Sequence, residues 1–344
     1  MYQGLVQPVL GSLRAVREHV NFSSDLRGSA GAHGVFTFDP ASGGGRYTKI
    51  GTSVDLSEWR IIDHCAAITR AYAIFERFFL VLVEQYIWDI ARVRTFGELN
   101  ERLRETILKN VGRFLGDHDK ERYSDINPAE VIREIHEAME GKLGYEISGD
   151  VIIRQEQNLR VEEIVRILSS IGFEDVEGWL KRHPLTKEFF ESFDAWSNTI
   201  SSQQREIIKY RNEAAHGLVE EVLGADVLIE FTYFLEVMCK VMCELVTRER
   251  MKIEESCKRV SEIGHVSERF SNNVCIVRSD GGFFWVGQRI YLVNDNRCRE
   301  SQILEIQLED SPYDKLICLY GPVEVGLRLD VVPGKRDRVL WLAK

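Results

Sequence analysis

The sequence predicts a mainly α-helical protein that ends in a small β-rich domain. Apolar residues recur with the 3.6-residue period of amphipathic helices from about residue 57 onward. Beyond Gly264 this period gives way to short alternating or apolar runs, which are separated by glycine-containing turns. We therefore expect three parts: an N-terminal segment (1–56), a helical domain (57–262) and a β-rich domain (263–344).

The first part predicts a short helix followed by a loop-rich segment. Its stretch GVFTFDPASGGGRYTKIG has two short strand-like runs around a glycine-rich turn, which is typical of a β-hairpin. The run Gly43-Gly44-Gly45 invites comparison with a phosphate-binding loop. The Gly-Lys-Ser/Thr ending that such a loop needs is missing, so we interpret the run as a turn.

Several helices are expected in the second part from their caps and their apolar faces. Ser57 is a cap candidate for a long first helix, and Asn127 followed by Pro128 begins another. The segment 183–217 predicts one or two helices, and a long, largely apolar final helix follows from Ala225.

The last part predicts five short strands, which suits a small barrel or a sandwich. Its aromatic run Phe283-Phe284-Trp285 could stack on nucleic-acid bases. Core packing is the interpretation that we favour for a barrel of this size.

Composition favours a globular protein without a general affinity for nucleic acid. The formal net charge is −10, so no overall basic field attracts RNA or DNA, although a local basic patch would suffice. Neither a signal peptide nor an apolar run long enough to span a bilayer is evident. We therefore expect a soluble, cytoplasmic protein with no membrane partner.

The seven cysteines form no C-x-x-C pair and no disulfide framework, which indicates reduced thiols. Cys239 and Cys243 have the i,i+4 spacing of metal ligands on a helix. Their neighbours are apolar almost throughout, which favours core packing. We expect no metal site.

One polar cluster stands out in the helical domain, in the stretch IIKYRNEAAHGLVEE. Asn212 and His216 are four residues apart and share a helix face, which Arg211 flanks. A histidine moves protons near neutral pH, whereas an arginine grips a phosphate and stabilises developing negative charge. An asparagine orients either group or a ribose hydroxyl. The trio therefore suits metal-free cleavage of an RNA backbone by its own 2′-hydroxyl.

A plainer interpretation of the same residues is a helix C-terminus. The helix dipole favours a histidine near that end, and Gly217 is a typical terminator. One histidine is also few for a reaction that needs both an acid and a base. A two-fold dimer that brings two such helices together would supply two histidines and two arginines.

The stretch YRNEAAHG is similar to the R-x4-H motif of the HEPN superfamily, in its form Arg-Asn-x-x-x-His-Gly. The segment ITRAYAIFERFFLVLVEQYI resembles the long early helix of that superfamily. The segment SGDVIIRQEQNLRVEEIVRILSSIGF resembles the part that precedes the motif in larger bacterial defence and toxin proteins. The resemblance covers about residues 57–250 and implies an antiparallel helical bundle.

The resemblance also implies a metal-independent endoribonuclease that works at a dimer interface without a cofactor. By motif position, Arg211 and His216 would be catalytic and Asn212 supporting. Glu76 corresponds to the acidic residue of the early helix and is a supporting candidate, with a buried or capped carboxylate as the alternative. Lys209 lies upstream of the motif, where it would contact RNA phosphates or be solvated.

These implications predict an RNA substrate, a homodimer, and an antitoxin or other defence-system partner protein in a toxin or anti-phage role. Cleavage would leave a 2′,3′-cyclic phosphate, and the β domain would bind a trigger, a substrate or a regulator. Leu218 stands where some HEPN toxins have a tyrosine that is modified, so silencing of that kind is not expected. The alternative is a non-catalytic HEPN binding or sensor module in a defence or regulatory complex.

Overall fold

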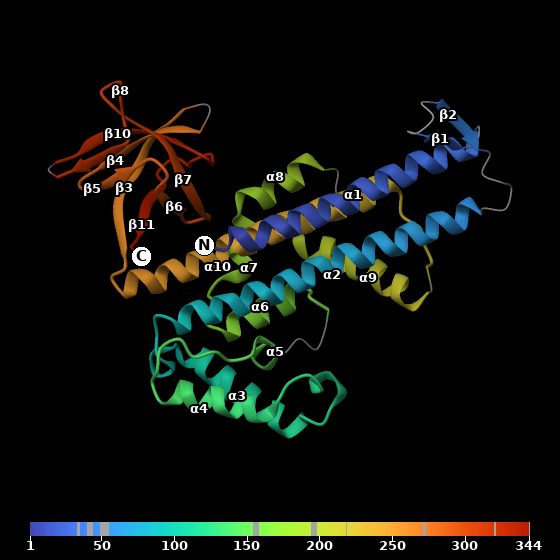
Figure 1. Cartoon of the computed structure of the whole chain (residues 1–344), viewed down its shortest axis with the longest axis horizontal. Helices are drawn as coiled ribbons and strands as arrows, with labels where there is room; N and C mark the ends of the chain where they lie inside the picture. The colour runs from blue at the N-terminus through green and yellow to red at the C-terminus, as the bar shows by residue number, and fades with distance from the viewer. Residues whose placement is uncertain are drawn as a thin grey trace.

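Three long helices form the frame of the molecule and lie side by side (Figure 1). They are α1 (Gln3–Ala32), α2 (Leu56–Ala91) and α10 (Ala225–Ser256). A β-barrel follows α10 at one end of this frame. The predicted class, mainly α with a small C-terminal β-barrel, is therefore confirmed. The computed structural model describes residues 1–32, 35–39, 44–48, 55–153, 158–193, 198–217, 219–270, 273–319 and 321–343.

Helix α1 is much longer than the short helix that we predicted for the N-terminal segment. Pro8 and several glycines weaken its intrinsic helix propensity. However, Leu13, Val16 and Val20 recur at helical spacing and are buried in the core that α1 shares with α2 and α10. Tertiary packing of this apolar face therefore outweighs local propensity, and α1 is part of the helical bundle.

The caps of two helices test the cap predictions. The side chain of Asp55 accepts hydrogen bonds from the N–H groups of Ser57 (2.8 Å) and Glu58 (3.3 Å), so Asp55 caps α2 and the Ser57 prediction is wrong. The Asp55 carboxylate accepts both hydrogen bonds, whereas Ser57 is itself one of the two donors and lies inside the helix. The predicted Asn127 cap is confirmed by its hydrogen bond from the N–H of Ala129 at 3.0 Å.

Shorter helices cover the frame and position the polar cluster. In chain order they are η1 (Phe96–Glu98), α3 (Glu101–Asp117), η2 (Glu121–Tyr123), α4 (Pro128–Met139), α5 (Gly149–Ile152), α6 (Val161–Ser170), α7 (Val176–Arg182), α8 (Pro184–Ser192) and α9 (Ile200–His216). Helix α9 packs on α2 and α6. No helix in the described residues is both long and apolar enough to cross a bilayer.

The C-terminal strands close into an antiparallel six-stranded barrel. Their order is β10-β4-β3-β11-β6-β7, and β7 pairs back with β10. The strands are β3 (Val260–Arg269), β4 (Val274–Ser279), β6 (Arg289–Asn294), β7 (Arg297–Leu308), β10 (Val323–Leu329) and β11 (Arg338–Leu342). The short β8 (Ser311–Tyr313) pairs with β7, and β5 (Gly282–Trp285) pairs with β9 (Lys315–Cys318).

More strands form than the five predicted. Gly287, with a φ of 89°, splits one predicted strand into β5 and β6. The aromatic run divides in the same region, because Phe284 is buried in the barrel core whereas the Phe283 side chain is 52% exposed. Core packing is thus confirmed for Phe284 and wrong for Phe283.

The helical and β-rich parts meet before Gly264. Helix α10 ends at Ser256 and β3 begins at Val260, so the boundary predicted between 262 and 263 falls inside the strand. Gly264 has a φ of 151° and lies where the pairing of β3 with β11 shifts register. A Cβ atom there would lie 2.6 Å from the carbonyl oxygen of Arg278. Gly264 therefore lies at a β-bulge where the backbone of β4 comes close. In the sequence this glycine indicates the start of the β-rich domain.

Strands are also present in the N-terminal part, where a hairpin was expected. β1 (Val35–Asp39) pairs antiparallel with β2 (Gly44–Thr48), with Val35 opposite Thr48. Of the predicted glycine turn, Gly43 lies outside the described residues. Gly44 and Gly45 belong to β2 and pair with Asp39 and Phe38, so the turn prediction is wrong for these two glycines.

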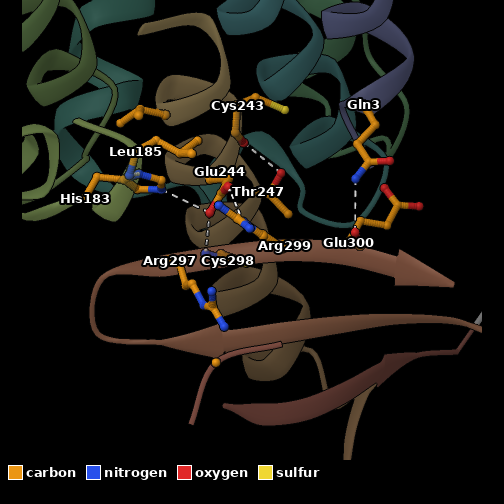
Figure 2. A network of polar contacts seen from close by, with 12 residues as sticks. Gln3, His183, Leu185, Cys243, Glu244, Thr247, Arg297, Cys298, Arg299 and Glu300 are labelled. Atoms are coloured by element: carbon orange, nitrogen blue, oxygen red, sulfur yellow. Dashed lines mark hydrogen bonds and ion pairs between the residues drawn. The ribbon is translucent and has the colours of Figure 1, made fainter. Parts of the chain in front are cut away.

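Glu244 of α10 joins the barrel to the helices (Figure 2). Its carboxylate accepts hydrogen bonds from the N–H of Cys298 at 3.1 Å and from Nε of Arg299 at 2.8 Å, both on β7. His183 donates from Nε2 to the same carboxylate at 3.1 Å, because its Nδ1 accepts from the N–H of Leu185. These bonds hold one barrel strand against α10.

Candidate active site

Helix α9 carries the polar cluster and ends in a glycine cap. The Thr199 side chain accepts a hydrogen bond from the N–H of Ser202 at 3.2 Å and begins the helix. Gly217 takes a left-handed φ of 69°, and its N–H donates to the carbonyl of Glu213. His216 is therefore the last helical residue, as the helix-end interpretation of the sequence proposed. The cluster and this helix end coincide, so the two interpretations do not exclude each other.

Arg211 lies against an aromatic ring of α2. Its guanidinium carbon is 5.1 Å from the centroid of the Tyr72 ring. Its Nη1 donates a hydrogen bond to Oδ1 of Asn212 at 3.1 Å. A guanidinium has five N–H donors, and among the described residues only Asn212 receives one. The arginine is thus held in place while keeping donors for a ligand such as a phosphate.

Asn212 positions the arginine. Its Oδ1 accepts from Arg211 and also from Nδ2 of Asn158 at 3.2 Å. Asn158 precedes α6, so the amide of Asn212 ties α9 to a second segment of the bundle. All three side chains are half-buried. The amide oxygen of Asn212 thus links Arg211 to Asn158, which is compatible with the supporting role predicted for Asn212.

Glu76 reaches the cluster through Tyr72. The Tyr72 hydroxyl accepts a hydrogen bond from the N–H of Leu159 at 2.8 Å and is itself hydrogen-bonded to Glu76. Burial raises the pKa of Tyr72, and the negative charge of Glu76 raises it further. The phenol is therefore protonated near neutral pH and donates to the carboxylate. Glu76 therefore lies next to Tyr72, whose ring contacts the guanidinium of Arg211.

His216 lies at the exposed end of α9. Its side chain is exposed, and the structure gives its imidazole no hydrogen bond within the described part of the chain. Helix geometry places Asn212 and His216 on one face, one turn apart, with Arg211 flanking them. The imidazole is thus free to meet a substrate or a second chain, while Arg211 is anchored inside the bundle.

The structure does not bring Lys209 to this cluster. Its Nζ lies 3.9 Å from the Glu213 carboxylate, on the same helix, and its side chain is 52% exposed. Two residues before Arg211, it points about 160° away around the helix axis. Of the two roles predicted for Lys209, a solvated side chain fits this position better than a contact with RNA phosphates. Leu218, the other position noted beside the motif, lies outside the described residues.

Sequence patterns missed two members of the cluster. Tyr72 lies one helical turn before Glu76, so the i,i+4 spacing that places both on one face of α2 was a usable signal. Asn158 lies in an irregular segment between helices and carries no periodic signal. Its contact with Asn212 depends on how the chain folds back.

The cysteine pair noted in the sequence lies in the helical core. Cys239 and Cys243 are buried in the helical core, and burial raises the pKa of both thiols. Their predicted role in core packing is confirmed. In the ranges that the structure describes, no three His, Cys, Asp or Glu side chains cluster in a way that could hold a metal ion.

Comparison with known proteins places the chain in a family. The model of the RiboL-PSP-HEPN family matches residues 48–248, which is more than half of the chain and includes α2, α9 and most of α10. No curated protein and no solved structure gives a significant match. The matched region contains every residue of the polar cluster around Arg211. The chain therefore belongs to the RiboL-PSP-HEPN family, which supports, in general terms, a nuclease-type, RNA-related or defence-type module.

Proposed function

We propose that the protein is a metal-independent endoribonuclease whose catalytic residues are Arg211 and His216. The observation that carries this proposal is the anchored guanidinium of Arg211, held by Tyr72 and Asn212, on the helix that ends in an exposed His216. The guanidinium of Arg211 is fixed where negative charge is to be stabilised, and the imidazole of His216 is accessible for proton transfer. Membership in the RiboL-PSP-HEPN family supports an RNA-directed activity.

The chemistry follows from the two side chains. His216 as a neutral imidazole takes the proton of a ribose 2′-hydroxyl, and the 2′-oxygen attacks the adjacent phosphorus. Arg211 donates hydrogen bonds to the non-bridging oxygens as negative charge builds on them. The bond from phosphorus to the 5′-oxygen breaks, and that oxygen takes a proton from a general acid. The products are a 2′,3′-cyclic phosphate and a 5′-hydroxyl end.

A second copy of the chain would supply the general acid. One chain has a single His216, whereas the reaction needs a group that accepts a proton and a group that donates one. The end of α9 is exposed at Ala215, His216 and Gly217, and the two small residues let another backbone approach closely. A two-fold dimer through this end would place two imidazoles and two arginines around one phosphate.

Such an enzyme fits a defence or toxin role. RNA cleavage stops growth, and the barrel docked on α10 gives the protein a second unit through which a trigger or an antitoxin-like partner would act. The hydrogen bonds of Glu244 to Arg299 and to the N–H of Cys298 support this proposal, because they couple the barrel to a frame helix of the catalytic bundle.

The test is product analysis on a fluorescent single-stranded RNA in the presence of EDTA. We expect cleavage that leaves a 2′,3′-cyclic phosphate. A single 2′-deoxy substitution at the cleaved nucleotide should block that cut, because the nucleophile is gone. RNA binding without any cleavage, with or without divalent cations, would instead establish the non-catalytic binding module. Cleavage that survives 2′-deoxy substitution would contradict the proposed chemistry.

A further inference from the structure

A pocket of about 350 Å³ lies where α10 begins, away from the barrel. Its walls come from the C-terminal part of α1, the N-terminal part of α2 and the first turn of α10. Figure 1 shows that the C-terminal end of α9 lies toward the same end of the bundle. The lining residues that matter here are Arg27, Arg60, Asp63, His64, Gly224 and Ala225.

His64 lines this pocket and has a buried hydrogen-bond donor. Its Nδ1 accepts from the N–H of Leu223 at 3.3 Å, so the proton of the neutral ring is on Nε2. Burial lowers the pKa of His64, and the charge of Arg60 lowers it further, which favours the neutral ring. Only 1% of the residue is exposed, yet Nε2 has no hydrogen-bond partner in the described chain. Buried donors in native proteins nearly always have an acceptor, so this one points to a ligand.

The start of α10 adds more donors. Gly224 is the N-cap, and no side chain caps the helix there. The first N–H groups of this 32-residue helix therefore lie at the pocket, and the positive pole of the helix dipole lies at the same end. The exposed Asp226 in the first turn offsets part of that charge. An uncapped N-terminus of this kind binds anions.

One of the two arginines that line the pocket has no carboxylate partner in the described chain. Arg27 pairs with Asp63, which also accepts a hydrogen bond from Ser23, so this carboxylate is neutralised. Arg60 is exposed and donates from Nη2 to the carbonyl of Val222 at 3.0 Å. Within the described residues no carboxylate pairs with Arg60. The pocket therefore has one uncompensated guanidinium beside the Nε2–H donor and the helix N-terminus.

We propose that this pocket binds a phosphate group, held by Arg60, the Nε2–H of His64 and the first N–H groups of α10. A guanidinium fork matches two phosphate oxygens, and a helix N-terminus receives a third. The volume is at the lower end of the range for ligand pockets, so it accommodates a phosphate together with part of a nucleoside. A free mononucleotide and the backbone of an RNA strand both supply that chemistry.

The pocket is connected to the candidate active site. The His64 ring packs edge-on against Tyr210, with ring centroids 5.9 Å apart, and Tyr210 directly precedes Arg211. The Tyr210 hydroxyl donates to Glu221 at 2.9 Å, in the segment that links His216 to α10. A phosphate here would therefore stiffen the segment that follows His216. The binding proposal rests on the pocket alone and does not require cleavage.

Calorimetric titration tests the proposal with three probes: inorganic phosphate, adenosine 5′-monophosphate and a fully 2′-O-methylated single-stranded oligoribonucleotide, which resists 2′-hydroxyl attack. We expect at least one probe to bind, and Arg60→Ala to weaken its binding about tenfold or more. Arg70→Ala is the matched control, since Arg70 is an exposed arginine of the same helix outside the pocket. It should leave binding of phosphate or nucleotide unchanged.

The three probes also separate the two sources of phosphate. Binding of inorganic phosphate and the mononucleotide identifies a small-molecule site, whereas binding of the oligonucleotide alone identifies an RNA backbone subsite. In either case the Nε2–H resonance of His64 in a ¹⁵N-labelled sample should shift on saturation. Absence of binding by all three, or equal binding by wild type and Arg60→Ala, would overturn the proposal. Repeating the titration in His216→Ala keeps this result independent of cleavage.

Discussion

The guanidinium carbon of Arg211 on α9 lies 5.1 Å from the centroid of the Tyr72 ring on α2. This contact fixes the arginine of the candidate site to one of the three frame helices. The same tyrosine holds Glu76 and the N–H of Leu159 through its hydroxyl. Tyr72 therefore connects the site to the core, and its ring and hydroxyl are separable by mutation.

Tyr72→Phe and Tyr72→Leu should differ in their effect on cleavage. The phenylalanine variant keeps the ring under Arg211 but leaves the buried N–H of Leu159 without its acceptor, at a cost of about 1–3 kcal/mol in the free energy of unfolding. The leucine variant also loses the cation–π contact, worth about 0.5–2 kcal/mol. We expect RNA cleavage to fall further in Tyr72→Leu than in Tyr72→Phe.

Urea denaturation and a cleavage assay on the same samples check this expectation. Tyr313→Phe is the control, because this tyrosine is 42% exposed on the barrel and should change stability by less than about 0.5 kcal/mol. Equal cleavage by the two Tyr72 variants would show that the ring does not position Arg211.

Gly217→Ala should destabilise the protein and displace His216. The left-handed φ of 69° costs an alanine about 1–2 kcal/mol, although the space around a new Cβ is open. Gly112→Ala is the matched control, since Gly112 lies inside α3 with equally open space and should gain about 0.5–1 kcal/mol. Opposite signs in denaturant unfolding are expected, and a stabilised Gly217→Ala would show that this helix end is not built as described.

The free energy of unfolding should depend on pH through the carboxyl group of Glu244. Burial raises the pKa of Glu244, but the hydrogen bond from His183 and the hydrogen bond and charge of Arg299 outweigh burial and hold it below the ordinary 4.5. The folded state therefore favours the carboxylate. This contribution is fully present above about pH 4.5 and is lost as the pH falls through the lower, folded-state value.

Glu244→Gln isolates that contribution. Near pH 7 we expect a loss of about 1–3 kcal/mol in the free energy of unfolding, and the gap to wild type should narrow as the pH falls below about 4.5. Glu305→Gln is the control, because its pair with Arg328 is about half exposed and contributes about 1 kcal/mol at most. A gap that widens on acidification would refute the sign of the Glu244 pKa shift.

Local signals sufficed for α9 and for its motif, but not for the groups that surround them. The R-x4-H spacing and the terminating glycine are both contained within a few residues, so Arg211, Asn212 and His216 could be named from the sequence. Tyr72 and Asn158 meet them only because α2 and the segment before α6 fold against α9. Contacts between segments so distant in the chain have no local pattern.

The same distinction explains the errors elsewhere in the fold. The length of α1 depends on the apolar surface that α2 and α10 offer it, which its proline and glycines conceal. The Nε2–H of His64 is identified as a donor only because the N–H of Leu223 bonds to Nδ1. Its place beside the start of α10 also depends on the fold. Alternating strands and turn glycines predicted the barrel class, whereas its closure depends on the pairing of β7 with β10.

The most direct test of the central claim compares the RNA cleavage rates of wild type, His216→Ala and His136→Ala in EDTA. His136 is an exposed histidine on α4 outside the candidate site, so its loss controls for removal of an imidazole. We expect His216→Ala to slow cleavage about 100- to 10,000-fold, as for loss of a general acid or base, and His136→Ala to retain the wild-type rate. Equal rates in wild type and His216→Ala would contradict the assignment of the active site.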